Sequence, residues 1–453
     1  MNLPNYFLAD LPPEATLTPT MIGEACQTLK HNREQYLLRR STASLVETLC
    51  GVAEEWLQPE NPFRQFALKE GPAVCGFSSA TLANGLDAFF KRFTVENLNA
   101  LLVQEFGHLQ RLDEIVATSA EEKKSRAAAV RGPELLVHIA AGNIPNPTLM
   151  SIVQGVLLRS AQFVKCAQGA AFLPRLFAHS LYEADHKLGA CLELASWRGG
   201  DPLLEAAMFA ESDCVTVTGG DETLASVRQR LPVRTRFLGY GHRVSFGFVA
   251  GSALSSFSAK KVVARAAADV TAWNQLGCLS PHVIYVEHGG AVSAENFAQM
   301  LADELARREG LEPRGEVPVE TAATIASRRA FYEVRAAHSP DTRCWRSDNS
   351  TAWTVVYEAD PRFQLSCLNR FIYVKGVTDL KGVLENVDTV RGQVSTVGIA
   401  ASEDQMPPIA LSLARWGATR VCPLGQMQDP PLTWRHDGRP ALGDLVTWTD
   451  FEL

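Results

Sequence analysis

The segment "WNQLGC", residues 273–278, places a cysteine on a tight turn between two expected elements. The apolar spacing before it predicts a helix with Gly277 just beyond its end, and the strand "HVIYVE" follows. Turns of this kind display reactive side chains, so Cys278 is a candidate nucleophile. A helix C-terminus would raise a thiol pKa, so activation has to come from amide donors or from a positive group bound beside the thiol.

The chain has ten cysteines, and the other nine have no comparable position. Their spacing contains no CxxC or CxxH pair, so the sequence does not predict a zinc site. In a reducing compartment most cysteines are buried small hydrophobic residues. The same interpretation is the alternative for Cys278.

Three histidines, His138, His242 and His282, lie in or beside the motifs described here. A histidine near a nucleophile can move protons at neutral pH. His242, in "GYGHR", is the preferred candidate for proton transfer or for orienting a substrate. The alternative for each is a histidine that is hydrogen-bonded within the fold.

Two loops could hold a nucleotide. "AAGNIPNP" (140–147) follows one apolar strand, and "TGGDE" (218–222) follows another and opens a helix. Gly219 and Gly220 would let the main chain approach a pyrophosphate, which a helix N-terminus also attracts. The two acids that follow suit helix capping and would repel a nearby phosphate, so a simple turn stays the alternative. Lys165, at the end of the strand "AQFVKC", could bind ribose hydroxyls or a phosphate, or could simply be solvated.

The elements that must position these residues alternate between strand and helix from about residue 131, which is typical of a parallel sheet wound on both faces. The alternation restarts near residue 251. We therefore expect an α/β fold with two doubly wound lobes, 131–250 for the cofactor and 251–425 for the cysteine. Residues 1–130 read as a helical region packed on the cofactor lobe, and 426–453 as a C-terminal tail.

Composition excludes some classes of protein. The chain has 453 residues, a net charge of -7 and a pI near 5.9, whereas a nucleic-acid-binding protein would be basic. The N-terminus has neither the basic nor the apolar segment of a secretory signal, and no apolar run is long enough to span a bilayer. The sequence predicts a cytoplasmic globular protein.

In their order along the chain, "GNIPNP", "KCAQ", "TGGDE", "GYGHR" and "NQLGC" resemble the motifs of the aldehyde dehydrogenase superfamily. "HIAAGNIPNP", "WNQLGCLSPHVIYVE" and the C-terminal "HDGRPALGDLVTWTDFE" are most similar to the LuxC-type acyl-CoA reductases, the fatty-acid reductase subunit of bacterial bioluminescence. The resemblance covers roughly residues 130–453. It implies an aldehyde-dehydrogenase-like fold with the active site between the lobes.

The resemblance also implies roles for individual residues. Cys278 matches the family's catalytic cysteine, and Asn143 matches the asparagine whose amide helps to form the oxyanion hole. Lys165 falls where the superfamily holds the adenosine ribose. Gln168 stands where many dehydrogenases have a glutamate on the ribose hydroxyls; a neutral residue removes a repulsion against a 2′-phosphate, which favours NADPH.

Thr218, Gly219 and Gly220 match the superfamily's pyrophosphate turn. Two departures from its pattern carry information. Leu238 stands where aldehyde dehydrogenases have the glutamate that activates hydrolytic water, so an acyl-enzyme should survive until hydride arrives. "LNRFIYVKGV" (368–377) lies where a glutamate normally contacts the nicotinamide ribose, and it has no carboxylate.

The expected function is NADPH-dependent reduction of a fatty acyl thioester, carried by coenzyme A or an acyl-carrier protein, to the aldehyde through an S-acyl intermediate on Cys278. One alternative is an acyltransferase or thioesterase that uses the same acyl-cysteine without a redox step. Another is a non-catalytic subunit that keeps the fold as a scaffold. The resemblance further implies an acyl-protein synthetase as partner and assembly into a homo-oligomer.

Overall fold

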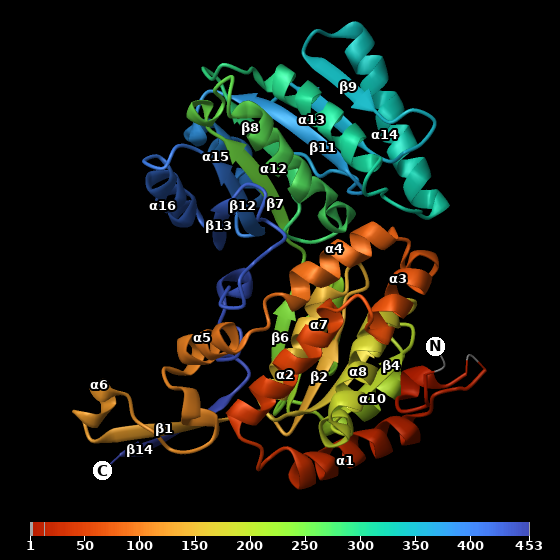
Figure 1. The fold of residues 1–453 in the computed structure, drawn as a ribbon, viewed down its shortest axis with the longest axis vertical. Helices are drawn as coiled ribbons and strands as arrows, with labels where there is room; N and C mark the ends of the chain where they lie inside the picture. Colours follow the sequence, from red (N-terminus) through yellow and green to blue (C-terminus); the bar gives the residue numbers. More distant parts are fainter. Residues whose placement is uncertain (1–2, 13, 453) are drawn as a thin grey trace.

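The structure is a computed structural model that describes residues 3–12 and 14–452. It has two α/β lobes, each with its own sheet, and a two-stranded ribbon that projects from the lower lobe in Figure 1. Among the described residues, no helix combines the length and the apolar character needed to cross a bilayer.

The cofactor lobe contains a five-stranded parallel sheet with the order β4-β3-β2-β5-β6. Its strands β2 and β3 are buried along their whole length, as expected for apolar strands covered on both faces. Because the strands are parallel, their carboxyl ends lie at one edge, which faces the other lobe. The strands are β2 (Leu135–Ile139), β3 (Ala161–Cys166), β4 (Leu192–Ser196), β5 (Cys214–Thr218) and β6 (Arg236–Tyr240).

Helices cover both faces of this sheet. α2, α3 and α8 pack together with α7 on one face, and α1 packs with α10 on the other (Figure 1). The helices between the strands are α7 (Asn146–Leu157), α8 (Phe172–Ala184), α9 (His186–Gly189), α10 (Pro202–Glu211) and α11 (Asp221–Arg230). The preceding helices are η1 (Leu8–Asp10), α1 (Pro19–Tyr36), α2 (Thr42–Leu57), α3 (Pro62–Cys75), α4 (Ser79–Phe90), α5 (Val95–Phe106), η2 (Leu109–Leu112) and α6 (Ser119–Glu122).

The cysteine lobe contains a seven-stranded sheet with the order β13-β12-β7-β8-β11-β10-β9, in which only the edge strand β9 is antiparallel. Two apolar cores lie on its two faces, one beneath α12 and α13 and the other beneath α14, α15 and α16. The strands are β7 (Val244–Val249), β8 (Pro281–Glu287), β9 (Thr342–Arg346), β10 (Thr354–Glu358), β11 (Phe371–Val377), β12 (Val394–Ala400) and β13 (Arg420–Pro423). The helices are η3 (Gly251–Ala253), α12 (Ala259–Thr271), η4 (Ala272–Gln275), α13 (Ala294–Glu309), α14 (Val319–His338), α15 (Leu380–Asn386), η5 (Asp388–Val390) and α16 (Met406–Trp416).

After β13 the chain returns to the cofactor lobe through η6 (His436–Gly438), as the blue segment of Figure 1 shows. It ends in β14 (Thr447–Glu452), which pairs antiparallel with β1 (Arg126–Arg131). The Arg236 guanidinium donates to the carbonyl of Val446 at 2.7 Å and so ties the returning segment to β6. Residues far apart in the sequence thereby meet at the amino end of β6.

The predicted helix that ends at Leu276 is wrong in one respect. α12 ends at Thr271, and Trp273–Gln275 adopt left-handed main-chain angles. Gly277 therefore does not follow the end of a regular helix.

The chain crosses from the five-stranded sheet to the seven-stranded sheet between Tyr240 and Val244. Residue 250, where the sequence predicts the boundary between the lobes, comes directly after β7.

Candidate active site

A cavity of about 1020 Å³, part of it open to solvent, lies where the lobes meet, and Cys278 lines it. The carboxyl edge of the cofactor sheet contributes Thr218 and Tyr240. One face of α7 and the loop before it contribute further side chains, among them Ile144, Met150 and Gln154. The returning C-terminal segment closes the cavity with Gln428, Pro430, Pro431, Leu432, Trp434 and His436.

Cys278 lies in a short loop between η4 and β8, where the sequence predicts a turn between helix and strand, and it is half-buried. The loop is held from inside the sheet, because the Ser245 hydroxyl of β7 donates to the Cys278 carbonyl at 2.8 Å. The Ser280 amide donates to the Gly277 carbonyl at 3.0 Å and closes a turn around the cysteine. Gly277 permits the close approach of Gln428, since a Cβ at that position would lie 2.6 Å from the Gln428 side chain.

Burial raises the pKa of the Cys278 thiol to about 12, and the nearby Asp437 carboxylate acts in the same direction. The main-chain amides of Cys278 and Leu279, together with the Arg243 guanidinium, lower it. At neutral pH the thiol is thus protonated. The main cause is desolvation rather than the helix dipole that the sequence suggested, and attack by this sulfur requires a proton acceptor.

Two asparagines lie near the Cys278 loop, Asn143 in the loop after β2 and Asn146 at the start of α7. Asn143 is exposed, and its amide donates to the carbonyl of Leu276 at 3.4 Å, two residues before Cys278. Asn143 lines a second cavity, whose walls include Phe77 and Leu276. Asn146 lines the Cys278 cavity itself, and its buried Oδ1 has no donor among the described residues. The resemblance singled out Asn143 alone.

The three predicted histidines lie in different surroundings. His138 is buried in β2 between Thr216 (2.7 Å) and Gln162 (3.1 Å), and burial lowers its pKa to about 4. His242 is exposed, its amide donates to Asp221, and it does not line the Cys278 cavity. His282, in β8, accepts the Ser366 amide at 3.1 Å, and burial lowers its pKa to about 4.

His436 is the histidine that lines the cavity with Cys278, and the sequence did not single it out. Its ring stacks on Tyr240 with centroids 4.5 Å apart and lies 4.7 Å from Trp434. Burial lowers the pKa of His436, so the imidazole is neutral near pH 7. The only available signal was its place in the motif "HDGRPALGDL", because the distance along the chain to Cys278 gives no hint of contact.

The glycine turn has open space beside it at the start of α11. Gly219 and Gly220 precede α11, and the space around a Cβ at Gly220 is open. Asp221 starts the helix, but its carboxylate accepts the His242 amide at 3.0 Å and is thus engaged away from the turn.

Lys165 and Gln168 lie at the carboxyl end of β3. Lys165 is buried, its Nζ lies 5.7 Å from the centre of the Trp197 ring, and burial lowers its pKa. Gln168 is exposed in the loop beyond the strand. β4 runs alongside with Cys166 opposite Ser196, and its loop carries the exposed Arg198 two residues further on.

Leu238 is buried within β6, opposite Thr216 of β5. The Asp437 carboxylate on the returning segment acts on the Cys278 thiol and raises its pKa. That carboxylate accepts from the Arg243 guanidinium at 3.0 Å and from the Ser395 hydroxyl at 3.2 Å. These two hydrogen bonds hold the Asp437 carboxylate in place.

Two α/β lobes of this topology, with the cysteine loop and the glycine turn at their boundary, define an aldehyde-dehydrogenase-like fold. Delta-pyrroline-5-carboxylate dehydrogenase from Mycobacterium tuberculosis superposes with a TM-score of 0.69 at 14% identity over 96% of this chain and 83% of that chain. Its structure bound with NAD gives a TM-score of 0.68. Proline utilization A from Bradyrhizobium japonicum gives 0.72 at 16% identity over 96% of this chain and 45% of that chain. The predicted fold class is confirmed.

Within this fold class, the sequence identifies the family. The family model of acyl-CoA reductase (LuxC) matches residues 38–448, so the chain belongs to the LuxC family of acyl-CoA reductases. Long-chain acyl-protein thioester reductase from Aliivibrio fischeri is 24% identical over 423 residues, 90% of this chain and 82% of the relative. The protein of the same name from Photorhabdus laumondii is 21% identical over 417 residues, again 90% and 82%. The predicted family and its reductase class are confirmed, and the match extends well into the N-terminal helices.

Proposed function

We propose that the chain reduces a long-chain acyl thioester to the aldehyde through an S-acyl intermediate on Cys278, with NADPH as reductant. One observation carries the proposal: Cys278 and Thr218, of the glycine turn, line the same cavity between the lobes. A thiol and a nucleotide-binding turn that converge on one space suit acyl transfer to sulfur followed by reduction. The names of the relatives, acyl-protein thioester reductases, support the substrate class.

The first step is attack by sulfur. The Cys278 thiol gives its proton to a ring nitrogen of His436 and forms a bond to the thioester carbon, whose carbonyl electrons move onto oxygen. His436 suits this role because it is neutral near pH 7 and lines the same cavity. The tetrahedral species then collapses, the bond to the carrier sulfur breaks, and the proton on His436 passes to the departing thiolate.

The oxyanion needs donors. The Cys278 main-chain amide and the Asn143 side-chain amide are proposed for it, since Asn143 already reaches the main chain two residues before the cysteine. Asn146 is the competing donor because it lines the cavity wall. A single donor of this kind is worth about 3 kcal/mol of transition-state stabilisation.

A bound nicotinamide cofactor would supply hydride to the acyl carbonyl. Thr218, Gly219 and Gly220 would hold its pyrophosphate at the start of α11, and Lys165 would bind its adenosine ribose. Cys278 would then carry the anion of a thiohemiacetal. Breakage of its carbon–sulfur bond releases the aldehyde, and the Cys278 thiolate takes a proton from solvent, because His436 has already passed its proton to the carrier thiol.

Two residues are the reason to propose NADPH rather than NADH. Gln168 brings no charge against a 2′-phosphate, and Arg198 extends from the adjacent strand as an exposed cation. A Cβ at Gly199, next to Arg198, would lie 3.6 Å from Lys165 Nζ, so this loop borders the ribose-binding lysine. Lys165, Gln168 and Arg198 thus lie around one proposed ribose site.

The residues at the site support reduction over hydrolysis, and the cavity walls support a long-chain substrate. Leu238 offers no base for water, and Asp437 is engaged by Arg243 and Ser395. The cavity walls carry apolar side chains such as Ile144, Met150 and Leu432, which suit an acyl chain. An acyl-protein synthetase as supplier and a homo-oligomeric state are proposals from the family resemblance alone.

The acyl-enzyme itself can be trapped. Incubation with a long-chain acyl-CoA in the absence of NADPH should add one acyl mass to the intact protein, mapped to the Cys278 peptide. Addition of NADPH should remove the mass and release aldehyde. Release of free fatty acid without NADPH would instead indicate a thioesterase, and transfer to an added thiol would indicate an acyltransferase.

A further inference from the structure

The turn that leads into the Cys278 loop has an unfavourable main-chain conformation. Trp273, Asn274 and Gln275 have φ angles of 49°, 53° and 65°, in the left-handed region that residues other than glycine rarely adopt. Only asparagine among the three tolerates this region readily. A second run of the same kind, Leu368–Arg370, has φ angles of 58°, 55° and 64°. Such conformations persist only where the surroundings fix them.

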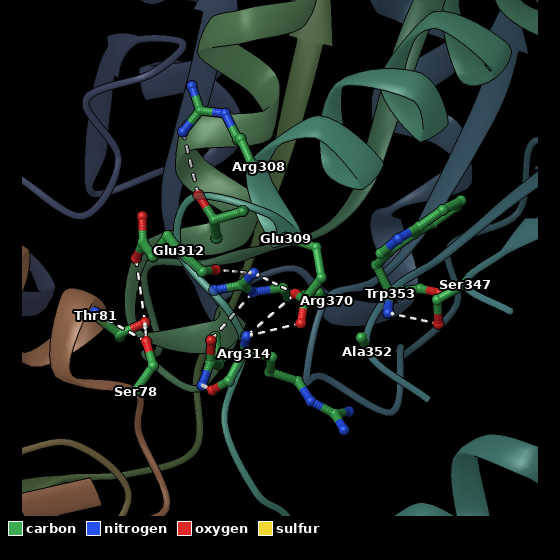
Figure 2. A network of polar contacts seen from close by, with 12 residues as sticks. Ser78, Thr81, Arg308, Glu309, Glu312, Arg314, Ser347, Ala352, Trp353 and Arg370 are labelled. Atoms are coloured by element: carbon green, nitrogen blue, oxygen red, sulfur yellow. Dashed lines mark hydrogen bonds and ion pairs between the residues drawn. The ribbon is translucent and has the colours of Figure 1, made fainter. Parts of the chain in front are cut away.

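Arg370 joins the two turns. Its fully buried guanidinium donates from Nε to Asn274 Oδ1 at 3.1 Å and from Nη1 to Glu309 at 2.9 Å and to the Glu312 carbonyl at 2.8 Å. Figure 2 shows Arg370 at the centre of this network, beside Glu309. The Asn274 amide donates in turn to the Arg314 carbonyl at 2.7 Å. Both polar ends of Asn274 are therefore held by the network.

The other two residues of the turn fix its position. The buried Gln275 side chain donates to the carbonyls of Pro281 at 2.7 Å and Phe371 at 2.9 Å. The first of these bonds spans residues 276–280 and closes the loop that carries Cys278. Trp273 packs edge-on against Phe77, with ring centroids 5.2 Å apart. A shift of the turn would thus be passed directly to the cysteine.

The network also contacts the cofactor lobe. The Thr81 hydroxyl of α4 donates to Glu312 at 3.2 Å, as Figure 2 shows. Gly315 lies against the turn between α3 and α4, where a Cβ would lie 2.4 Å from the Gly76 carbonyl oxygen. Segment 309–316 therefore contacts Arg370 and Asn274 on one side and the cofactor lobe on the other.

We propose that Arg370 is a positioning residue for the Cys278 nucleophile: through Asn274 it holds the left-handed Trp273–Gln275 turn and so sets where the sulfur stands between the lobes. The proposal rests on the proposed function for its kinetic consequence. Its structural consequence, a fixed and shielded Cys278, does not depend on turnover. Arg370 itself lines neither cavity at Cys278 or Asn143.

The test compares Arg370→Met and Asn274→Ala, alone and combined, with Arg329→Met as the matched control. Arg329 is a buried arginine of the same lobe that donates to Thr354 at 2.8 Å and to the Trp353 carbonyl at 2.7 Å, at the start of β10. NADPH oxidation with a long-chain acyl-CoA gives kcat and KM. Iodoacetamide labelling, quantified on the Cys278 peptide at pH 8, reports the environment of the thiol. All variants are compared well below their melting temperatures.

Arg370→Met and Asn274→Ala should each lower kcat by about tenfold or more with little change in KM for NADPH, because a small misplacement of a reacting group is costly. Alkylation of Cys278 should rise roughly three- to tenfold as its shielding is relaxed. The kcat of the double variant should be no lower than that of either single variant, since both substitutions remove the same hydrogen bond between Arg370 and Asn274. Arg329→Met should leave both readouts near wild type.

Equal behaviour of Arg370→Met and Arg329→Met would overturn the proposal, as would kcat losses that multiply in the double variant. If Arg370→Met does not fold, Asn274→Ala carries the same comparison. If the wild type oxidises no NADPH, the proposed reduction fails by itself, and the alkylation rates still decide whether Arg370 fixes Cys278.

Discussion

Arg243 and Asp437 form an ion pair, with 3.0 Å between Nε and Oδ2, that joins the start of β7 to the returning C-terminal segment. The two charges act on the Cys278 thiol in opposite directions, since Asp437 raises its pKa and Arg243 lowers it. The segment that closes the cavity therefore also adjusts the nucleophile.

Asp437→Asn should make Cys278 more reactive. Removal of the carboxylate lowers the thiol pKa, so iodoacetamide labelling of the Cys278 peptide at pH 8 should rise about two- to tenfold. Arg243→Gln removes the opposing charge and should slow labelling. The interpretation of the pair is wrong if both substitutions shift the rate in the same direction.

His436→Gln should lower kcat on the order of 100-fold, the usual contribution of a general base. His242→Gln is the control, because His242 does not line the cavity, and it should stay within about twofold of wild type. The base must be neutral to act, and burial lowers the pKa of His436, so activity should persist below pH 6.5 and fall only as His436 protonates. A pH–rate profile in wild type and both variants measures this. A large loss in His242→Gln with His436→Gln unaffected would reverse the assignment.

Asn143→Ala and Asn146→Ala decide which amide supports the oxyanion. Removal of the true donor should cost about 3 kcal/mol of transition-state stabilisation, measured from kcat/KM for an acyl-CoA. Removal of the other asparagine should cost much less. We expect the larger loss in Asn143→Ala. If Asn146→Ala shows it instead, the cavity wall rather than the motif match identifies the donor.

Gln168→Glu and Arg198→Ala should each raise KM for NADPH by about tenfold or more while leaving KM for NADH nearly unchanged, since each removes a favourable setting for the 2′-phosphate. Steady-state kinetics with both cofactors provide the measurement. Arg228→Ala, which removes an arginine of α11 that packs over Phe237, is a matched surface control. Equal effects on both cofactors would show that these residues do not read the 2′-phosphate.

Much of this arrangement could be predicted from the sequence, because apolar strands and glycine turns are local signals. The strands around "HIAAGN" and "FVKC", and the position of Cys278 in a loop just before a strand, follow from such patterns. The left-handed turn at Trp273–Gln275 could not be predicted, since the helical spacing of α12 continues through those residues while tertiary contacts fix their main chain. The pairing of β14 with β1 and the position of His436 depend on the return of the tail across both lobes, for which the sequence has no local signal.

The central claim is that Cys278 carries the acyl group during an NADPH-dependent reduction. The most direct measurement is NADPH oxidation, followed at its absorbance band, with medium- and long-chain acyl-CoA, using the wild type and Cys278→Ala. We predict turnover with aldehyde as the product in the wild type and none in Cys278→Ala, while the variant still binds NADPH. Turnover that persists in Cys278→Ala, or a wild type that is acylated at Cys278 yet consumes no NADPH, would contradict the account.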